Sequence, residues 1–204
     1  MEKENIINKR VADFSKNIDI IQTILIFLIS LLVPTFLGEL ITKAFGANSV
    51  IGANSQIIIG TIVNIALVTA AINLKGWGKI LGVVTMPSIA TILGGYVFGT
   101  ASTYMTYMIP AIWVGNFALI YSYKFFMLGK NKNYFLAGII GIAIKVAVIF
   151  GFFEILNLCN VFPEKLVTTL QVAMSSTQLI TAILGTIFAF IIYKIEKNRT
   201  RLLA

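Results

Sequence analysis

The sequence predicts an all-α integral membrane protein with six transmembrane helices and both termini in the cytoplasm. Of its 204 residues, 58% are hydrophobic and 12% are charged, whereas soluble domains have about half and about a quarter. Apolar stretches of about 20 residues, the length that crosses the hydrocarbon of a bilayer, recur along the chain. Basic residues gather in alternate connecting segments. This composition excludes a disordered chain and a disulfide scaffold.

We treat residues 1–204 as a single membrane domain, because no polar stretch is long enough to form a second unit. The predicted spans cover residues 18–37, 55–74, 80–98, 106–126, 134–153 and 168–193. The polar stretch before the first span does not resemble a signal peptide, since no small-residue cleavage site follows a short apolar run. We therefore expect the first span to be a retained anchor.

Polar segments separate the later spans. Residues 75–79 form a basic turn between the second and third spans, and residues 129–133 form another between the fourth and fifth. Residues 157–163 form a polar loop before the last span, which is long enough to tilt in the bilayer. Pro87 and Pro110 lie inside the third and fourth spans, where we expect them to bend or break the helix.

The distribution of basic residues predicts the orientation. With a cytoplasmic N-terminus, the outer loops contain only Lys43 and Lys165, and Lys145 lies deep within a span. Every other Lys and Arg lies on the inner side, including Lys124 at the inner end of the fourth span. Cytoplasmic loops carry such an excess of Lys and Arg. We therefore predict a multi-pass protein of the cell membrane. The net charge of +8 is interpreted as attraction to anionic lipid in the bilayer, and no nucleic-acid partner is expected.

The sequence lacks the groups on which most membrane enzymes depend. It has no His and one Cys, Cys159, which excludes Ser–His and Cys–His pairs and an internal disulfide. Every carboxylate lies in a tail, in a loop or at the end of a span, and no G-x-x-x-x-G-K-[ST] phosphate-binding loop is present. These absences predict a binding or passage protein that is not an enzyme and has no metal or cofactor.

Lys145 lies near the middle of the fifth span, about seven or more residues, and thus roughly 10 Å, from either end. An ionised Lys at that depth costs several kcal/mol unless it faces protein, water or an anion. Three interpretations are open. The lysine bonds to helix carbonyls or to a neighbouring amide, it pairs with an acidic group of a bound ligand, or its amine is neutral.

The last span carries a second polar signal. At about 100° per residue, one stripe contains Gln171, Ser175, Gln178, Ala182, Gly185 and Ala189. Small residues let helices approach closely, which explains the inner half of the stripe. The polar outer half either serves helix packing or lines a cavity that opens to the outside.

The fourth span adds Asn116, which shares a helix face with Trp113 and lies at a depth similar to that of Lys145 and Gln178. Convergent polar groups in an apolar pocket are typical of small-ligand sites. Tyr107 is either at the mouth of this pocket or in an interfacial aromatic belt, and Asn64 is expected to make an interhelical hydrogen bond. The predicted substrate-binding residues are Lys145, Asn116, Gln178, Gln171, Ser175, Trp113 and Tyr107.

In its architecture and its last third, the chain resembles the substrate-binding S components of energy-coupling factor (ECF) transporters. Pro163 is followed by Ser175-Ser176-Thr177-Gln178 and Ala182-Ile183-Leu184-Gly185, and residues 109–116 add weaker similarity. The resemblance implies a six-helix subunit that captures a vitamin or other micronutrient at its outer side, mostly with helices four to six. It also implies a membrane coupling subunit and ATPase subunits as partners. One departure is that residues 23–34 contain no Ala-x-x-x-Ala pair, which many members use for docking.

The expected function is therefore a high-affinity binding subunit for uptake of a small, water-soluble micronutrient, with an anionic one favoured, energised by separate ATPase subunits. Two alternatives belong to other classes. A non-catalytic scaffold or assembly subunit would use its intramembrane polar residues for helix packing alone, and a stand-alone secondary carrier would transport without ATP.

Overall fold

The structure, a computed structural model, describes residues 2–46, 48–94 and 102–202. Within these ranges the chain forms helices joined by short turns, without strands. The α-helices are α1 (Glu2–Leu32), α2 (Gly38–Phe45), α3 (Val50–Ala53), α4 (Ser55–Asn73), α5 (Trp77–Gly94), α6 (Ser102–Ser122), α7 (Tyr134–Leu158), α8 (Glu164–Met174) and α9 (Ser176–Leu202). Two π-helical segments, η1 (Val33–Leu37) and η3 (Tyr123–Gly129), follow α1 and α6. The predicted all-α fold class is confirmed.

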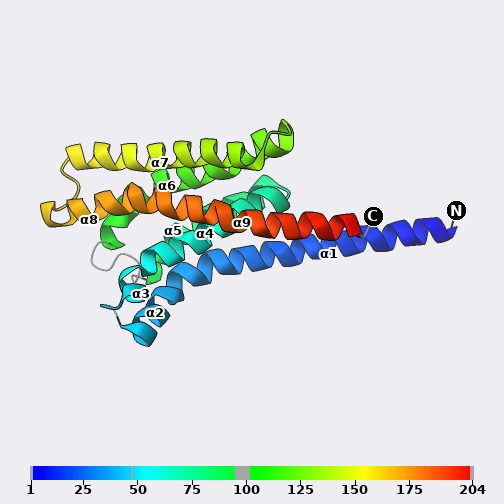
Figure 1. The fold of residues 1–204 in the computed structure, drawn as a ribbon, viewed down its shortest axis with the longest axis horizontal. Helices are drawn as coiled ribbons and strands as arrows, with labels where there is room; N and C mark the ends of the chain where they lie inside the picture. The colour runs from blue at the N-terminus through cyan, green and yellow to red at the C-terminus, as the bar shows by residue number, and fades with distance from the viewer. Residues whose placement is uncertain (1, 47, 95–101, 203–204) are drawn as a thin grey trace.

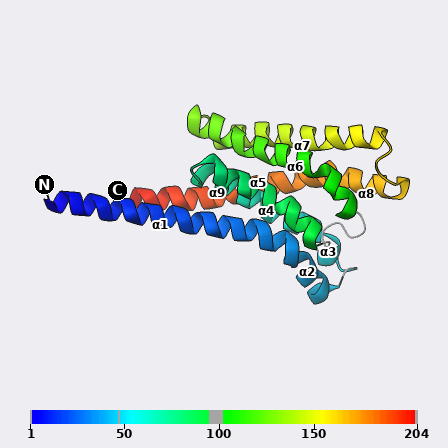
Figure 2. The ribbon, with the colours of Figure 1, turned by 180° about the vertical axis from the view of Figure 1, so that it is seen from behind.

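The long helices lie side by side in one bundle, and both ends of the chain lie at the same end of it (Figures 1 and 2). The most extensive packing joins α4 to α9 and α6 to α7. The short helices α2, α3 and α8 lie at the opposite end (Figure 1).

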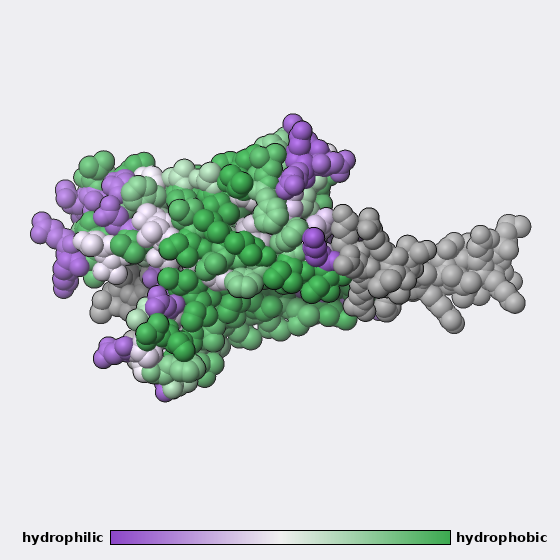
Figure 3. Space-filling view, in the orientation of Figure 1, coloured by the Kyte–Doolittle hydropathy of each residue, from purple (hydrophilic) through white to green (hydrophobic). Residues whose placement is uncertain are grey.

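The exterior of the bundle is apolar, as a bilayer requires. Figure 3 shows hydrophobic residues over the middle of the surface and hydrophilic residues toward its ends. Large apolar side chains such as Ile21, Ile144 and Ile191 point outward, with exposed fractions of 56%, 44% and 52%. Lipid is the environment in which such a surface is stable. The chain is thus a membrane protein in which these helices contact lipid.

Within the described residues, five helical segments are long and apolar enough to cross a membrane. They are Asn17–Phe45, Ser55–Asn73, Thr103–Gly129, Tyr134–Leu158 and Glu164–Ile195. The predicted third span, 80–98, ends in residues 95–98, which lie outside the described ranges, and α5 covers its earlier part. The count of six spans and the orientation stay predictions.

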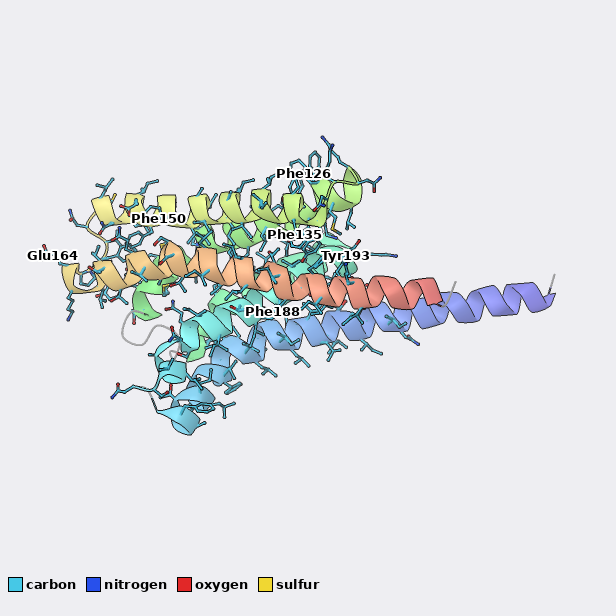
Figure 4. All side chains as sticks on the ribbon, in the orientation of Figure 1. Phe126, Phe135, Phe150, Glu164, Phe188 and Tyr193 are labelled. Carbon is cyan, nitrogen blue, oxygen red and sulfur yellow. The ribbon has the colours of Figure 1, made fainter. Side chains whose placement is uncertain are left out.

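Contacts between distant segments show which connections share an end of the bundle. Lys79 pairs with Asp19 of α1, and the Nζ of Lys124 donates to the carbonyl oxygen of Leu74 at 2.9 Å. The ring of Tyr193 near the C-terminus stacks on Tyr134, with centroids 5.6 Å apart. The labelled Phe135 and Tyr193 lie at this end in Figure 4, whereas Glu164 lies at the other. The basic turns therefore share one end with both termini.

Two expectations about helix continuity are corrected. The predicted span 168–193 is interrupted at Ser175, whose backbone angles of φ −112° and ψ −91° separate α8 from α9. One continuous stripe from Gln171 to Ala189 is therefore wrong, because the turn breaks the helical period. Pro87 and Pro110 break neither α5 nor α6, since both helices continue through them.

Glycines bring α4 and α9 together. A Cβ atom added at Gly185 would lie 2.4 Å from the Cβ of Asn64, and one added at Gly60 would lie 2.8 Å from the Cγ2 of Thr181. Only glycine permits backbones this close. This close approach lets Asn64 on α4 donate a hydrogen bond to Thr181 on α9. The bond positions Asn64 in the site described next.

Candidate functional site

A cavity lies inside the bundle, walled by α4, α5, α6, α7 and α9 with η1 beside them. The cavity has a volume of about 80 Å³. The apolar part of its wall consists of Pro34, Ile59, Gly60, Val63, Pro87, Met105 and Ile112, and the polar part of Gln56, Asn64, Ser88, Asn116, Lys145, Thr177, Gln178 and Thr181. An apolar cleft with a few polar groups is the usual form of a small-ligand site.

Lys145 is held from across the bundle. Its side chain is 2% exposed, and Nζ donates to Oδ1 of Asn64 at 2.6 Å. The Nδ2 atom of Asn64 donates to the carbonyl oxygen of Gly60 at 2.8 Å and to Oγ1 of Thr181 at 3.2 Å. Because both amide protons have acceptors, the amide oxygen of Asn64 is directed at the lysine. The bond to a neighbouring amide, the first of the three interpretations of Lys145, is thus observed, and the same amine also lies in the cavity wall.

The charge of Lys145 has no acidic partner within the described part of the chain. Asp19 forms an ion pair with Lys79, and Glu39 forms one with Lys43. An ammonium group has three N–H donors, and the recorded bond to Asn64 uses one of them. A buried cation without a counter-charge is costly. The remaining donors therefore favour an anion or water in the cavity.

Asn116 and Gln178 lie in the same cavity wall, as their similar depth predicts. Asn116 is 3% exposed, and its Nδ2 reaches the carbonyl oxygen of Val84 at 3.4 Å. The Nε2 of Gln178 reaches the carbonyl oxygen of Ala173 at the same distance of 3.4 Å. Both bonds are long for N–H donors, so both amides are weakly held and can turn toward a ligand.

The other four predicted residues lie outside the cavity wall. Tyr107 is 54% exposed, and Gln171 is exposed on α8. The hydroxyl of Ser175 donates to the carbonyl oxygen of Gln171 at 2.6 Å. Trp113 lies next to the cavity wall. Its indole nitrogen donates at 2.7 Å to Oγ of Ser88, which lines the cavity. The break at Ser175 explains why α8 does not share the polar face of α9.

Several lining residues were missed by the sequence-based reasoning. Asn64 makes the interhelical bond that was expected, but it also lines the cavity and holds the lysine. Gln56, Gly60 and Asn64 are spaced four residues apart. That spacing places them on one face of α4 and could have identified this wall of the cavity.

Comparisons with known protein families, with curated proteins and with solved structures find no match. The functional proposal therefore rests on the geometry of the cavity and on the sequence resemblance described above.

Proposed function

We propose that this chain is a membrane-embedded binding subunit that captures a small, water-soluble nutrient in the cavity beside Lys145. The observation that carries the proposal is a fully enclosed lysine that has an amide, and no described acid, as its partner while it lines a cavity. A cation used only for packing gains nothing from an adjacent cavity. A cation that receives an acidic group needs one.

The surrounding side chains fit this role. An acidic group at Nζ of Lys145 can also accept from the amide nitrogens of Asn116 and Gln178, which line the same cavity. Apolar neighbours such as Ile59 and Ile112 exclude water from these contacts. Charge-assisted hydrogen bonds are strongest in such low-dielectric surroundings.

The lining residues at one end of the bundle support an entry path for the ligand from that end. Gln56 lies in the first turn of α4 and Thr177 in the first turn of α9, at the end of the bundle that carries α2, α3 and α8 (Figure 1). In the orientation that the basic residues predict, this end faces the outside of the cell. A nutrient would then enter from the exterior and meet Lys145 at the deep end.

Energy for uptake would come from separate subunits, as the resemblance to ECF S components implies. In this proposal the chain lies in the cell membrane with both termini in the cytoplasm, binds a vitamin or other micronutrient, and docks on a coupling subunit with its ATPases. The absence of a phosphate-binding loop from the sequence supports the separation of ligand capture from ATP hydrolysis.

The proposal is tested by identifying what the chain carries. The wild type, Lys145→Gln and the lipid-facing control Val114→Ala, whose native side chain is 55% exposed, are purified from cells grown in rich medium, and their extracts are compared by mass spectrometry. We expect one small compound to co-elute with the wild type and the control and to be depleted from Lys145→Gln. Absence of any enriched compound together with no saturable binding would favour the scaffold alternative, and uptake into liposomes without ATP would favour the secondary carrier.

A further inference from the structure

The cavity has a second polar end, at Gln56. This residue lines the cavity, and its Nε2 atom is buried without a hydrogen-bond partner among the described residues. A buried N–H donor without an acceptor is unfavourable, and a ligand atom that accepts from it removes the penalty. The Gln56 amide is thus a second point at which the site can recognise its ligand.

The two polar ends are far apart along the bundle. Gln56 and Asn64, which holds Lys145, are separated by two turns of α4, about 12 Å between their Cα atoms. On the α4 side, the wall between them is apolar and includes Ile59 and Val63. A ligand that lies along α4 and satisfies both ends is therefore apolar in the middle and polar at its two extremities.

The charge and the volume of the cavity restrict the chemical class of the ligand. Lys145 is the one basic side chain among the lining residues that the structure describes, and none of these lining residues is acidic. A phosphate ester carries between one and two negative charges at neutral pH, more than one ammonium balances, whereas a carboxylate carries one. The cavity volume of about 80 Å³ is far below the roughly 300–1,000 Å³ of pockets for drug-sized molecules, so it suits a much smaller ligand.

We infer that the site selects a small monocarboxylate that lies lengthwise along α4, with its carboxylate at Lys145 and a hydrogen-bond acceptor at Nε2 of Gln56. This inference rests on the proposed function and specifies its ligand class. The site then rejects cations for lack of an acidic partner and dicarboxylates for lack of a second cation.

Four matched probes test the inference by calorimetry on the full chain in lipid nanodiscs, with empty nanodiscs subtracted. Valerate supplies the carboxylate, valeramide is its neutral analogue, glutarate adds a second carboxylate, and levulinate adds a ketone acceptor to valerate. We expect valeramide and glutarate to bind at least about tenfold more weakly than valerate, the effect of losing a charge-assisted hydrogen bond or adding an unpaired charge. Levulinate should bind about three- to tenfold more tightly than valerate, because a neutral hydrogen bond adds that much affinity.

The variant Gln56→Leu tests whether the preference for levulinate over valerate depends on Nε2 of Gln56. It should erase the advantage of levulinate over valerate and leave valerate binding in place. Gln171→Leu makes the same change on the exposed face of α8 and should keep the advantage. An advantage that survives in Gln56→Leu would overturn the role of Gln56.

Other outcomes separate this inference from the proposed function. Equal binding of valeramide and valerate, or failure of all four probes to bind, would overturn the monocarboxylate class. If the compound that co-elutes with the wild type is then a cation or a dianion, the binding-subunit proposal stands and only the ligand class is wrong. If no compound co-elutes either, both fail.

Discussion

Lys145 on α7 and Asn64 on α4 are 81 positions apart in the sequence, and the amine of one donates to the amide oxygen of the other at 2.6 Å. The bond joins two helices and holds the amine in the cavity wall. Because the amide of Asn64 is neutral, this hydrogen bond supplies no counter-charge for the amine.

Replacing Asn64 by Asp tests whether the partner of Lys145 must be neutral for the ligand to bind. The substitution is nearly isosteric and places a carboxylate against the Lys145 amine, so the protein supplies internally the charge that we assign to the ligand, although it removes the donor to the carbonyl oxygen of Gly60. We expect Asn64→Asp to stay folded and to bind the co-eluting compound at least about tenfold more weakly. Affinity is measured by calorimetry and folding by thermal unfolding in detergent.

The matched control is Asn133→Asp, which changes the same side chain at the start of α7, in the exposed turn 129–133. Asp and Asn are about equally good at this N-cap position, so both affinity and Tm should match those of the wild type. Unchanged affinity in a folded Asn64→Asp protein would contradict the role of the lysine as the receiver of an acidic group.

A glycine substitution tests the close approach of α4 and α9. In Gly185→Ala the new methyl group would lie 2.4 Å from the Cβ of Asn64 and 3.0 Å from its backbone carbon, so the helices must separate. Overpacking of this kind costs about 1–3 kcal/mol. We expect a lower Tm and weaker ligand binding, since the shift also moves Asn64.

Gly151→Ala is the control for that experiment. A Cβ at Gly151 meets nothing within 4 Å, so its Tm should equal or slightly exceed that of the wild type. Equal Tm values for Gly185→Ala and the wild type would show that α4 and α9 are not in contact at this point.

The fold was largely predictable because its signals are local. The length of each apolar stretch and the basic turns are read directly from the sequence. The predicted start of the fifth span at Tyr134 coincides with the start of α7, after its N-cap Asn133. The break at Ser175 carried no such signal. Neither Gly nor Pro marks it, and the residues on both sides are compatible with a continuous helix.

The site was predictable only in part. Depth from the helix ends correctly grouped Asn116, Lys145 and Gln178 in one cavity wall. The role of Asn64 depends on which face of α4 meets α7 and α9, and helix rotation is set by long-range packing rather than by local pattern. An unbroken helix would place Gln171 and Ser175 on the same face as Gln178, and the turn at Ser175 prevents this.

Two glutamines in the last predicted span test the limits of the cavity. Gln178 lines it and Gln171 does not. We expect Gln178→Ala to weaken binding of the co-eluting compound about three- to tenfold through loss of one hydrogen bond. Gln171→Ala should bind like the wild type in the same titration. If Gln171→Ala weakens binding as much as Gln178→Ala does, the site extends onto α8.

The single cysteine tests the orientation. Cys159 is exposed at the end of α7, the end that the basic residues place outside the cell. A membrane-impermeant maleimide added to intact cells should label the wild type. The variant Cys159→Ser combined with Lys132→Cys, in the turn at the opposite end, should react only after permeabilisation. The reverse pattern would show that the termini face outward.

The central claim is that the buried ammonium of Lys145 receives the acidic group of a ligand, and the most direct measurement is the affinity of the co-eluting compound for Lys145→Gln. Glutamine can keep a hydrogen bond to Asn64 while it removes the charge. We expect a folded protein with Tm near that of the wild type and an affinity lowered about 10- to 100-fold. A folded Lys145→Gln protein that binds the compound as tightly as the wild type would contradict this claim.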